Sequence, residues 1–179
     1  EPTDWVLMNF IMDARTGLGR FRDFKISNYQ LMMKLIDACK DHSIEEILQM
    51  EDVAERVSLY HEHNELAKAQ IAKCATVHNN LVVLDLTEEE TIYATNRFVI
   101  YAMYPDCNIS IHKMWGLKKQ NVVFAIGKSI TNRSSKTNVG ELCLKYGGGG
   151  HMNAGTCQVE TSKAEAVLSE LIDTITNDG

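Results

Sequence analysis

The sequence has little of what marks several common classes of protein. It contains only two prolines and no apolar run of 18 or more residues, so a membrane-spanning helix is not expected. Its five cysteines lie at least 14 positions apart without a C-x-x-C pair, which argues against a zinc site or a disulfide framework. Unpaired, they are expected to be small buried side chains in a cytoplasmic protein.

Positive charge is scarce overall but concentrated in two places. The net charge of −6 argues against a protein that coats nucleic acid through a basic face. Basic residues cluster between residues 15 and 25 and again between residues 128 and 136, where no acidic residue interrupts them. An acidic protein with local basic clusters is typical of one that binds a small anionic group.

The first half of the chain is predicted to be helical. No glycine or proline occurs from Ile26 to Cys74, and apolar residues recur at helical spacing. The pattern predicts helices over residues 27–40 and 43–75, with Ser43 and a glutamate three positions later capping the second.

The longer of these helices carries a heptad-like row of side chains. The row consists of Val53, Val57, Tyr60, Asn64, Ala67 and Ile71. A row of this kind could support a homodimer. His61 and His63 are two positions apart on the same helix and point to different faces, so we expect exposed histidines rather than a metal site.

From about residue 77 the pattern changes to strands alternating with helices. The expected order is strand, helix, two strands, helix, strand and helix, at residues 80–86, 89–104, 108–115, 121–129, 137–146, 154–160 and 162–176. We expect the strand at 121–129 to be fully buried and Ser162 to cap the last helix. The predicted fold class is therefore α/β: a helical connector followed by a mixed-sheet α/β domain.

The most unusual stretch is "YGGGGHMNAGT", residues 146–156. It has no Lys-Ser/Thr ending, as a Walker loop requires, and the predicted helix precedes the glycines, which is the reverse of a dinucleotide-binding loop. One left-handed glycine, Gly147, is enough to end that helix. Gly148, Gly149 and Gly150 are expected to expose peptide N–H groups as a nest for a phosphate or carboxylate oxygen.

Side chains near the glycines support an anion site. His151 follows the run directly with a ring nitrogen that can donate to a phosphate oxygen, and Asn153 can add a further donor. Arg133 offers a planar fork suited to phosphate, and Ser134 offers a hydroxyl. Only a short predicted helix separates this pair from the glycines, so we expect the two segments to meet.

With these residues assembled, the C-terminal half resembles the DHH-associated domain of the DHH phosphoesterases. That superfamily includes RecJ nucleases, oligoribonucleases, cyclic-dinucleotide phosphodiesterases and manganese-dependent exopolyphosphatases. The resemblance lies in Gly148-Gly149-Gly150-His151 with its small-residue tail and in Arg133-Ser134 upstream. It implies that these residues and Asn153 hold a phosphate substrate: a short oligonucleotide, a nucleotide or polyphosphate.

The same resemblance divides the chain into three parts. Residues 1–25 resemble the last piece of a DHH catalytic domain, 26–76 its helical linker and 77–179 the substrate-binding domain. "FIMDARTGLGRF" resembles the last metal motif and nominates Asp13 alone as a ligand for Mn²⁺ or Mg²⁺. No Asp-His-His or D-x-D motif occurs, and one carboxylate cannot hold two metals. We therefore expect the chain to be the C-terminal part of a longer hydrolase, inactive or nearly so without the missing N-terminal catalytic domain.

Three hypotheses follow from the sequence. The leading one is the substrate-binding part of a metal-dependent phosphoesterase that cleaves phosphodiester or phosphoanhydride bonds. The second is a stand-alone phosphate or nucleotide binding module without catalysis. The third is a structural domain that dimerises through residues 53–71. The sequence does not select a substrate, because no run of stacking aromatic residues surrounds the glycines.

Overall fold

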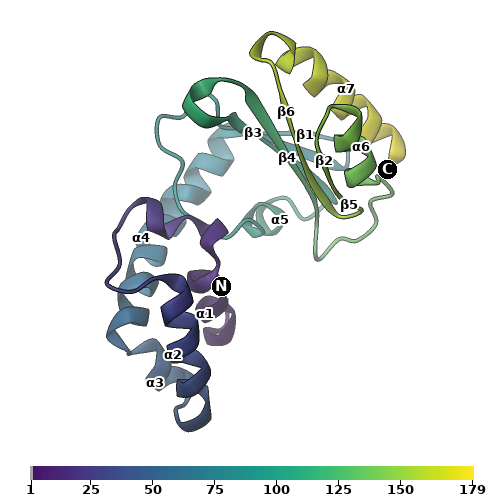
Figure 1. Cartoon of the computed structure of the whole chain (residues 1–179). Coiled ribbons are helices and arrows are strands. Elements are labelled where there is room, and N and C mark those ends of the chain that lie inside the picture. Colours follow the sequence, from purple (N-terminus) through teal and green to yellow (C-terminus); the bar gives the residue numbers. More distant parts are fainter. Residues whose placement is uncertain (1) are drawn as a thin grey trace. The chain divides into compact units, whose positions relative to one another are not determined.

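The computed structural model describes residues 2–179, which form two compact units (Figure 1). Unit 1 comprises the described residues up to Gln70 together with Ile92–Arg97, and unit 2 comprises Ile71–Thr91 and Phe98–Gly179. None of the helices in this described part combines the length and apolar character needed to cross a bilayer. The division into catalytic remnant, linker and substrate domain stays a prediction.

Unit 1 is built from helices and short 3₁₀ turns. They are α1 (Asp4–Met12), two 3₁₀ turns (Ala14–Thr16 and Leu18–Arg20), α2 (Asn28–Asp41), α3 (Ile44–Leu48) and α4 (Glu51–Cys74), whose last four residues belong to unit 2. The predicted cap at Ser43 is confirmed, since its hydroxyl accepts from the N–H of Glu46 and the Glu46 carboxylate accepts from Ser43. The predicted single helix over 43–75 is wrong, because the chain breaks between α3 and α4.

Four of the six residues of the heptad-like row on α4 are buried within their own chain, and Val57 and Asn64 are half-buried. Val53 and Tyr60 belong to the apolar core of unit 1, and Ala67 and Ile71 are also buried. These side chains are therefore not a free surface for a second copy. The histidine prediction is half wrong: His61 is exposed, but His63 is buried and accepts a hydrogen bond from the N–H of Ala94 at 3.1 Å.

Arg56 on α4 is the largest fully buried side chain of unit 1. Its guanidinium donates to the carbonyl oxygens of Asp52 (2.7 Å) and Ile26 (2.6 Å), and it stacks 4.0 Å from the ring centre of Phe24. These contacts tie α4 to the segment that leads into α2. A buried guanidinium is tolerated here because carbonyl oxygens and an aromatic face replace its water.

Unit 2 is one six-stranded mixed sheet with helices. The strand order is β1-β2-β3-β4-β6-β5, with β2 and β3 parallel and the other neighbours antiparallel. Its elements are β1 (Ala75–His78), β2 (Leu81–Asp85), α5 (Val99–Met103), β3 (Ile109–Trp115), β4 (Val122–Lys128), α6 (Val139–Lys145), β5 (Gly149–His151), β6 (Ala154–Val159) and α7 (Ala164–Asp178), with 3₁₀ turns at Leu117–Lys119 and Thr161–Lys163. The predicted α/β class is confirmed.

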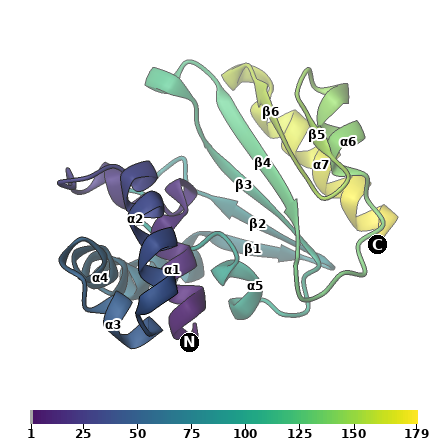
Figure 2. The ribbon, with the colours of Figure 1, turned by 60° about the horizontal axis from the view of Figure 1, so that its bottom comes forward.

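The core of unit 2 lies on one face of this sheet, under α6 and α7 (Figure 2). Ile111 of β3 and Phe124 of β4 point to that face and pack with Leu171 of α7. Lys113, on the same face of β3, bonds to Asp85 at 2.8 Å and to Glu165 of α7 at 2.5 Å. Burial alone would lower the pKa of Lys113, but these two carboxylates raise it.

Several sequence-based expectations for unit 2 are wrong for tertiary reasons. The strand at 121–129 alternates between buried and half-buried residues, because only one sheet face carries the core. The helix at 89–104 shrinks to α5, and residues 92–97 pack in unit 1 instead. Ser162 lies in a 3₁₀ turn, and α7 begins after Lys163 without a side-chain cap. Of the cysteines, Cys39 is exposed and Cys74 half-buried, while the other three are buried as expected.

Replacing Arg56 by Met should destabilise unit 1, because the Asp52 and Ile26 carbonyls lose their charged donor. We expect the free energy of unfolding to fall by about 2–4 kcal/mol in urea titrations followed by circular dichroism. Arg22→Met is the matched control: Arg22 is exposed, and the change should stay within about 0.5 kcal/mol. Equal stability of the two variants would contradict this role for Arg56.

Candidate functional site

The glycine run begins as the predicted helix end. Helix α6 stops at Lys145, and Gly147 takes the left-handed conformation with φ of +76°. The N–H of Gly147 donates to the Leu144 carbonyl (3.1 Å), and the N–H of Gly148 donates to the Cys143 carbonyl (3.0 Å). These bonds satisfy orphan carbonyl groups at the helix end. The predicted role of Gly147 is confirmed.

The next three residues form the edge strand β5 rather than a free loop. Gly149, Gly150 and His151 pair with Thr156, Gly155 and Ala154 of β6 across a two-residue turn, Met152–Asn153. In an antiparallel pair, opposite residues alternate between hydrogen-bonded and non-bonded positions. The expected continuous nest from Gly148 to Gly150 is therefore wrong, since Gly148 caps the helix and only alternate N–H groups of β5 can face a ligand.

Close packing explains two glycines of the run, Gly148 and Gly150, and also Gly140 on α6. A Cβ on Gly148 would lie 2.1 Å from the Thr156 carbonyl oxygen, and one on Gly150 would lie 2.3 Å from the Ala154 oxygen. A Cβ on Gly140, at the start of α6, would lie 2.8 Å from the Gly150 carbonyl oxygen. A Cβ on Gly149, by contrast, would meet no other atom within 4 Å. The run thus lets α6 lie directly against the β5–β6 hairpin.

His151 and Asn153 stand exposed at the tip of this hairpin. The N–H of Asn153 donates to Nδ1 of His151 at 3.3 Å. A neutral imidazole that accepts at Nδ1 carries its proton on Nε2. Nε2 is therefore a donor available to an anion, as the sequence predicted for His151.

Arg133 and Ser134 lie in the loop between β4 and α6. The Ser134 hydroxyl donates to Oδ1 of Asn132 (2.7 Å) and accepts from Nδ2 of Asn108 (2.9 Å). Arg133 is exposed and donates from Nε to the Ile130 carbonyl at 3.1 Å. Its two terminal nitrogens make no hydrogen bond to residues 2–179, so the fork is held at its base and open at its tip.

The loop and the hairpin are joined through the backbone. The N–H of Lys128 donates to the Asn153 carbonyl (2.9 Å), and the N–H of Val139 donates to the Met152 carbonyl (3.2 Å). The ammonium of Lys128 also donates to the Ser135 carbonyl at 3.0 Å. The structure therefore ties Met152 and Asn153 to the two residues that flank the 129–138 loop. Within residues 2–179 no hydrogen bond links Arg133 or Ser134 to the glycines or to His151, and the expected meeting of these two segments stays a prediction. In the sequence, Lys128 stood out only as part of a basic cluster. Its position at the end of a predicted strand was the signal that it could connect the hairpin to the loop.

Asp13, the predicted metal ligand, lies in unit 1 and is bound by a neighbour. Both its oxygens accept from the Arg15 guanidinium at 2.7–3.0 Å, and this hydrogen bonding lowers the pKa of Asp13. Within residues 2–179 no group of three or more His, Cys, Asp or Glu is placed to hold a metal ion. Asp13 alone cannot hold a divalent ion, because residues 2–179 bring no group of further ligands to it.

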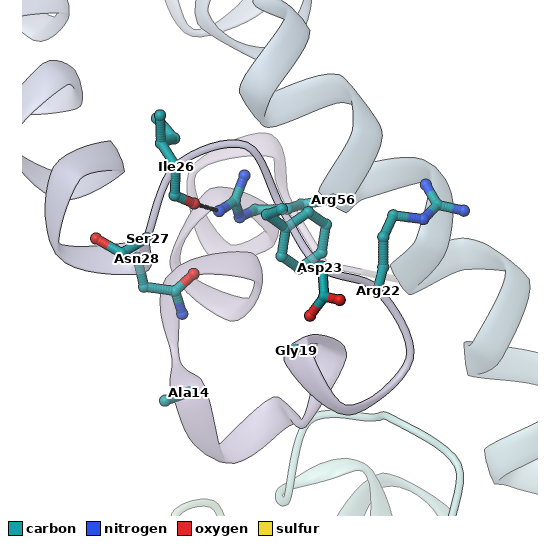
Figure 3. A pocket seen from close by; sticks show the side chains of 9 residues that line it. Ala14, Gly19, Arg22, Asp23, Ile26, Ser27, Asn28 and Arg56 are labelled. Atoms are coloured by element: carbon teal, nitrogen blue, oxygen red, sulfur yellow. Dashed lines mark hydrogen bonds between the residues drawn. The ribbon is translucent and has the colours of Figure 1, made fainter.

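A pocket of about 300 Å³ lies next to this segment in unit 1 (Figure 3). It is lined by Ala14, Gly19, Arg22, Asp23, Phe24, Ile26, Ser27, Asn28 and Arg56. Arg56 is committed to backbone carbonyls, and Nδ2 of Asn28 donates to the Met12 carbonyl at 3.2 Å. The pocket has the carboxylate of Asp23 beside its two arginines, so it is less suited to an anion than the hairpin and the loop.

Two further side chains of unit 2 bear on the site. Tyr146 donates from its hydroxyl to Glu170 (2.8 Å) and packs on the core, and burial together with that carboxylate raises its pKa to about 12. His112 lies on β3, on the sheet face opposite α6 and α7. Its side chain is half-buried, and burial lowers its pKa from 6.5 to about 4.

Gly148→Ala should destabilise unit 2, since its Cβ would collide with backbone atoms of β6 that cannot move alone. We expect a loss of about 1–3 kcal/mol in the free energy of unfolding, measured in denaturant. Gly149→Ala is the matched control and should cost nothing measurable. The packing explanation is wrong if the two variants unfold alike.

The stability of unit 2 should fall with acidity through His112. Its pKa is lower in the folded state than in the unfolded chain, so only the unfolded chain takes up a proton as the pH drops from 6.5. The stabilisation is complete above pH 6.5 and is lost progressively toward pH 4. His112→Gln should flatten that part of the stability profile, whereas His78→Gln should leave it steep.

Comparisons with known proteins agree with this architecture. No family model and no curated protein matches the chain. Among solved structures, the pGpG-specific phosphodiesterase PggH from Vibrio cholerae is 66% identical with a TM-score of 0.93, over 99% of this chain and 60% of that one. This chain therefore spans about three fifths of that relative.

Two other structures show the same fold at low identity. An exopolyphosphatase-related protein from Bacteroides fragilis is 16% identical with a TM-score of 0.54, over 83% of this chain and 43% of that one. The DHH domain of a member of the s1p family of ribosomal proteins is 13% identical with a TM-score of 0.50, over 97% of this chain and 50% of that one. These two structures show the fold alone, whereas the 66% identity to the phosphodiesterase, together with the glycine-histidine hairpin, identifies the chain as a DHH-superfamily C-terminal part.

Proposed function

We propose that this chain is the substrate-binding part of a phosphodiesterase acting on short oligonucleotides, with pGpG as the first candidate substrate. The observation that carries the proposal is the 66% identity to a pGpG-specific phosphodiesterase over nearly the whole chain. Two proteins this similar share their core and most of their binding surface.

The geometry of unit 2 supports a phosphate as the group that is held. Arg133 presents two unbonded guanidinium nitrogens, and His151 presents a donor at Nε2 on an exposed hairpin. Alternate N–H groups of β5, including one or more of its glycines, can add neutral donors. Charge-assisted hydrogen bonds of this kind bind phosphate more strongly than neutral donors do. The N–H of Asn153 holds the His151 ring, and the Ile130 carbonyl holds the base of the Arg133 guanidinium, while Ser134 is fixed by Asn108 and Asn132.

Catalysis would depend on residues beyond this chain. The relative is longer by about two fifths of its length, and we propose that this further part carries an Asp/His cluster for Mn²⁺ or Mg²⁺ to which Asp13 adds one carboxylate. Such ions, when bound, would supply an activated water and neutralise charge on the phosphate. A cytoplasmic location, which the unpaired cysteines favour, belongs to the same proposal.

Calorimetric titration of the chain with pGpG tests this function. We expect saturable binding that Arg133→Ala or His151→Ala weakens about 10- to 100-fold, the range for losing one hydrogen bond to a charged group. Lys163→Ala is the matched control, because Lys163 is exposed but lies beyond the opposite end of β6 from the hairpin turn.

Three results would count against the proposal. These are no binding by the unmodified chain, unchanged binding in both site variants, and an equal loss in Lys163→Ala. The last result would show that overall charge, rather than the hairpin and loop, attracts the dinucleotide. Hydrolysis of pGpG by the full-length protein with Mn²⁺, abolished by Asp13→Asn, would test the catalytic part separately.

A further inference from the structure

The sheet of unit 2 has a second face whose role the phosphate site does not explain. Side chains alternate along each strand, so residues that flank the buried Ile111 and Phe124 point away from α6 and α7. On β3 and β4 these residues include His112 and Ala125. They form a surface distinct from the apolar core.

Strand register places one continuous row on this face. His112 is opposite Ala125, Ala125 is opposite Thr156, and Thr156 is opposite Gly149. The next row on this face ends at His151, which lies two residues after Gly149 on β5 and opposite Ala154. His112 and the proposed phosphate site therefore share one face, with only small side chains between them.

Part of this face is covered and part is open. Helix α5 covers one end, where the Tyr101 hydroxyl donates to the Gly127 carbonyl (2.5 Å) and bonds to the Ser110 hydroxyl (2.8 Å). Farther along the same strands, Ala125 and Gly149 are half-buried and Thr156 is exposed. Small residues therefore form the strand surface between exposed His151 on β5 and half-buried His112 on β3.

His112 has no structural partner that accounts for it. No hydrogen bond joins its ring to any of residues 2–179, although the protein around it is dense enough to keep the imidazole neutral above about pH 4. On one side of His112 the face is covered, since Leu84 opposite it on β2 is buried, and on the other side lie half-buried Ala125 and exposed Thr156. A neutral aromatic ring at such a boundary is suited to stacking on another planar ring. Sheet faces with aromatic residues bind single-stranded nucleic acids in this way.

We propose that the strand face bearing His112, Ala125 and Thr156 holds a nucleobase of the substrate, with the His112 imidazole stacking on the base. This inference rests on the proposed function, because it assumes that His151 and Arg133 hold a phosphate of the same molecule. From β3 to β5 there are three strand intervals, a separation of about 14 Å. A nucleotide whose phosphate lies at the β5 edge can extend its sugar and base across that distance.

The test compares two ligands on the full chain: pGpG and an analogue of pGpG that keeps the sugars and phosphates but lacks both bases. His112→Ala should weaken pGpG binding about 5- to 150-fold, the range for losing one base–aromatic stack. It should leave binding of the base-free analogue unchanged. His112→Phe keeps an aromatic face and should bind pGpG within about 3-fold of the unmodified chain.

The matched control is His78→Ala, a half-buried histidine on the opposite edge strand β1, which should bind both ligands normally. Tight pGpG binding that survives His112→Ala would overturn this inference and leave the phosphate site standing. Equal loss of both ligands in His112→Ala would also overturn it, since the defect would then not concern the base. If the unmodified chain binds neither ligand, the proposed function itself fails.

Discussion

The close approach of helix α6 to the β5–β6 hairpin is the constraint on which the candidate site depends. Gly140 on the helix and Gly150 on β5 leave no room for a Cβ between them, and a Cβ on Gly155 of β6 would lie 3.0 Å from the Cys143 sulfur of α6. This contact fixes where β5 ends and therefore where His151 stands. It also orders the β4–α6 loop that presents Arg133, because the helix that follows this loop is the one held against the hairpin.

The glycine run thus has a different physical meaning from the one its composition suggests. Four glycines in sequence look like a flexible anion nest, yet Gly147 ends a helix in the left-handed conformation, Gly148 and Gly150 allow backbones to touch, and Gly149 is a strand residue with open space around it. Binding then falls to what the hairpin and the loop display, a histidine with Nε2 available as a donor and an arginine whose terminal nitrogens are unbonded within residues 2–179. Rigidity here serves recognition, since a held donor loses little conformational entropy when the phosphate arrives.

Local signals in the sequence were sufficient for some elements and not for others. The capping box at Ser43, the apolar run of β2 and the cap at Gly147 are encoded by near neighbours, and all three were predicted. The burial of His63 and the path of residues 92–97 depend on partners far along the chain, which periodicity does not reveal. The edge strand β5 pairs with nearby β6, but its three residues are too short and too rich in glycine to give a strand pattern. The candidate residues were found from chemical type and spacing. Their connection through Lys128 required the fold.

The central claim is that unit 2 binds the substrate phosphate at the hairpin and the adjoining loop. The most direct measurement is a titration of the ¹⁵N-labelled chain with pGpG, followed by the backbone amide signals in NMR. The account predicts that the largest shifts fall on residues 131–135 and 147–156 of unit 2. Shifts confined to the pocket residues 14–28 of unit 1, or spread evenly over the basic surface, would contradict it.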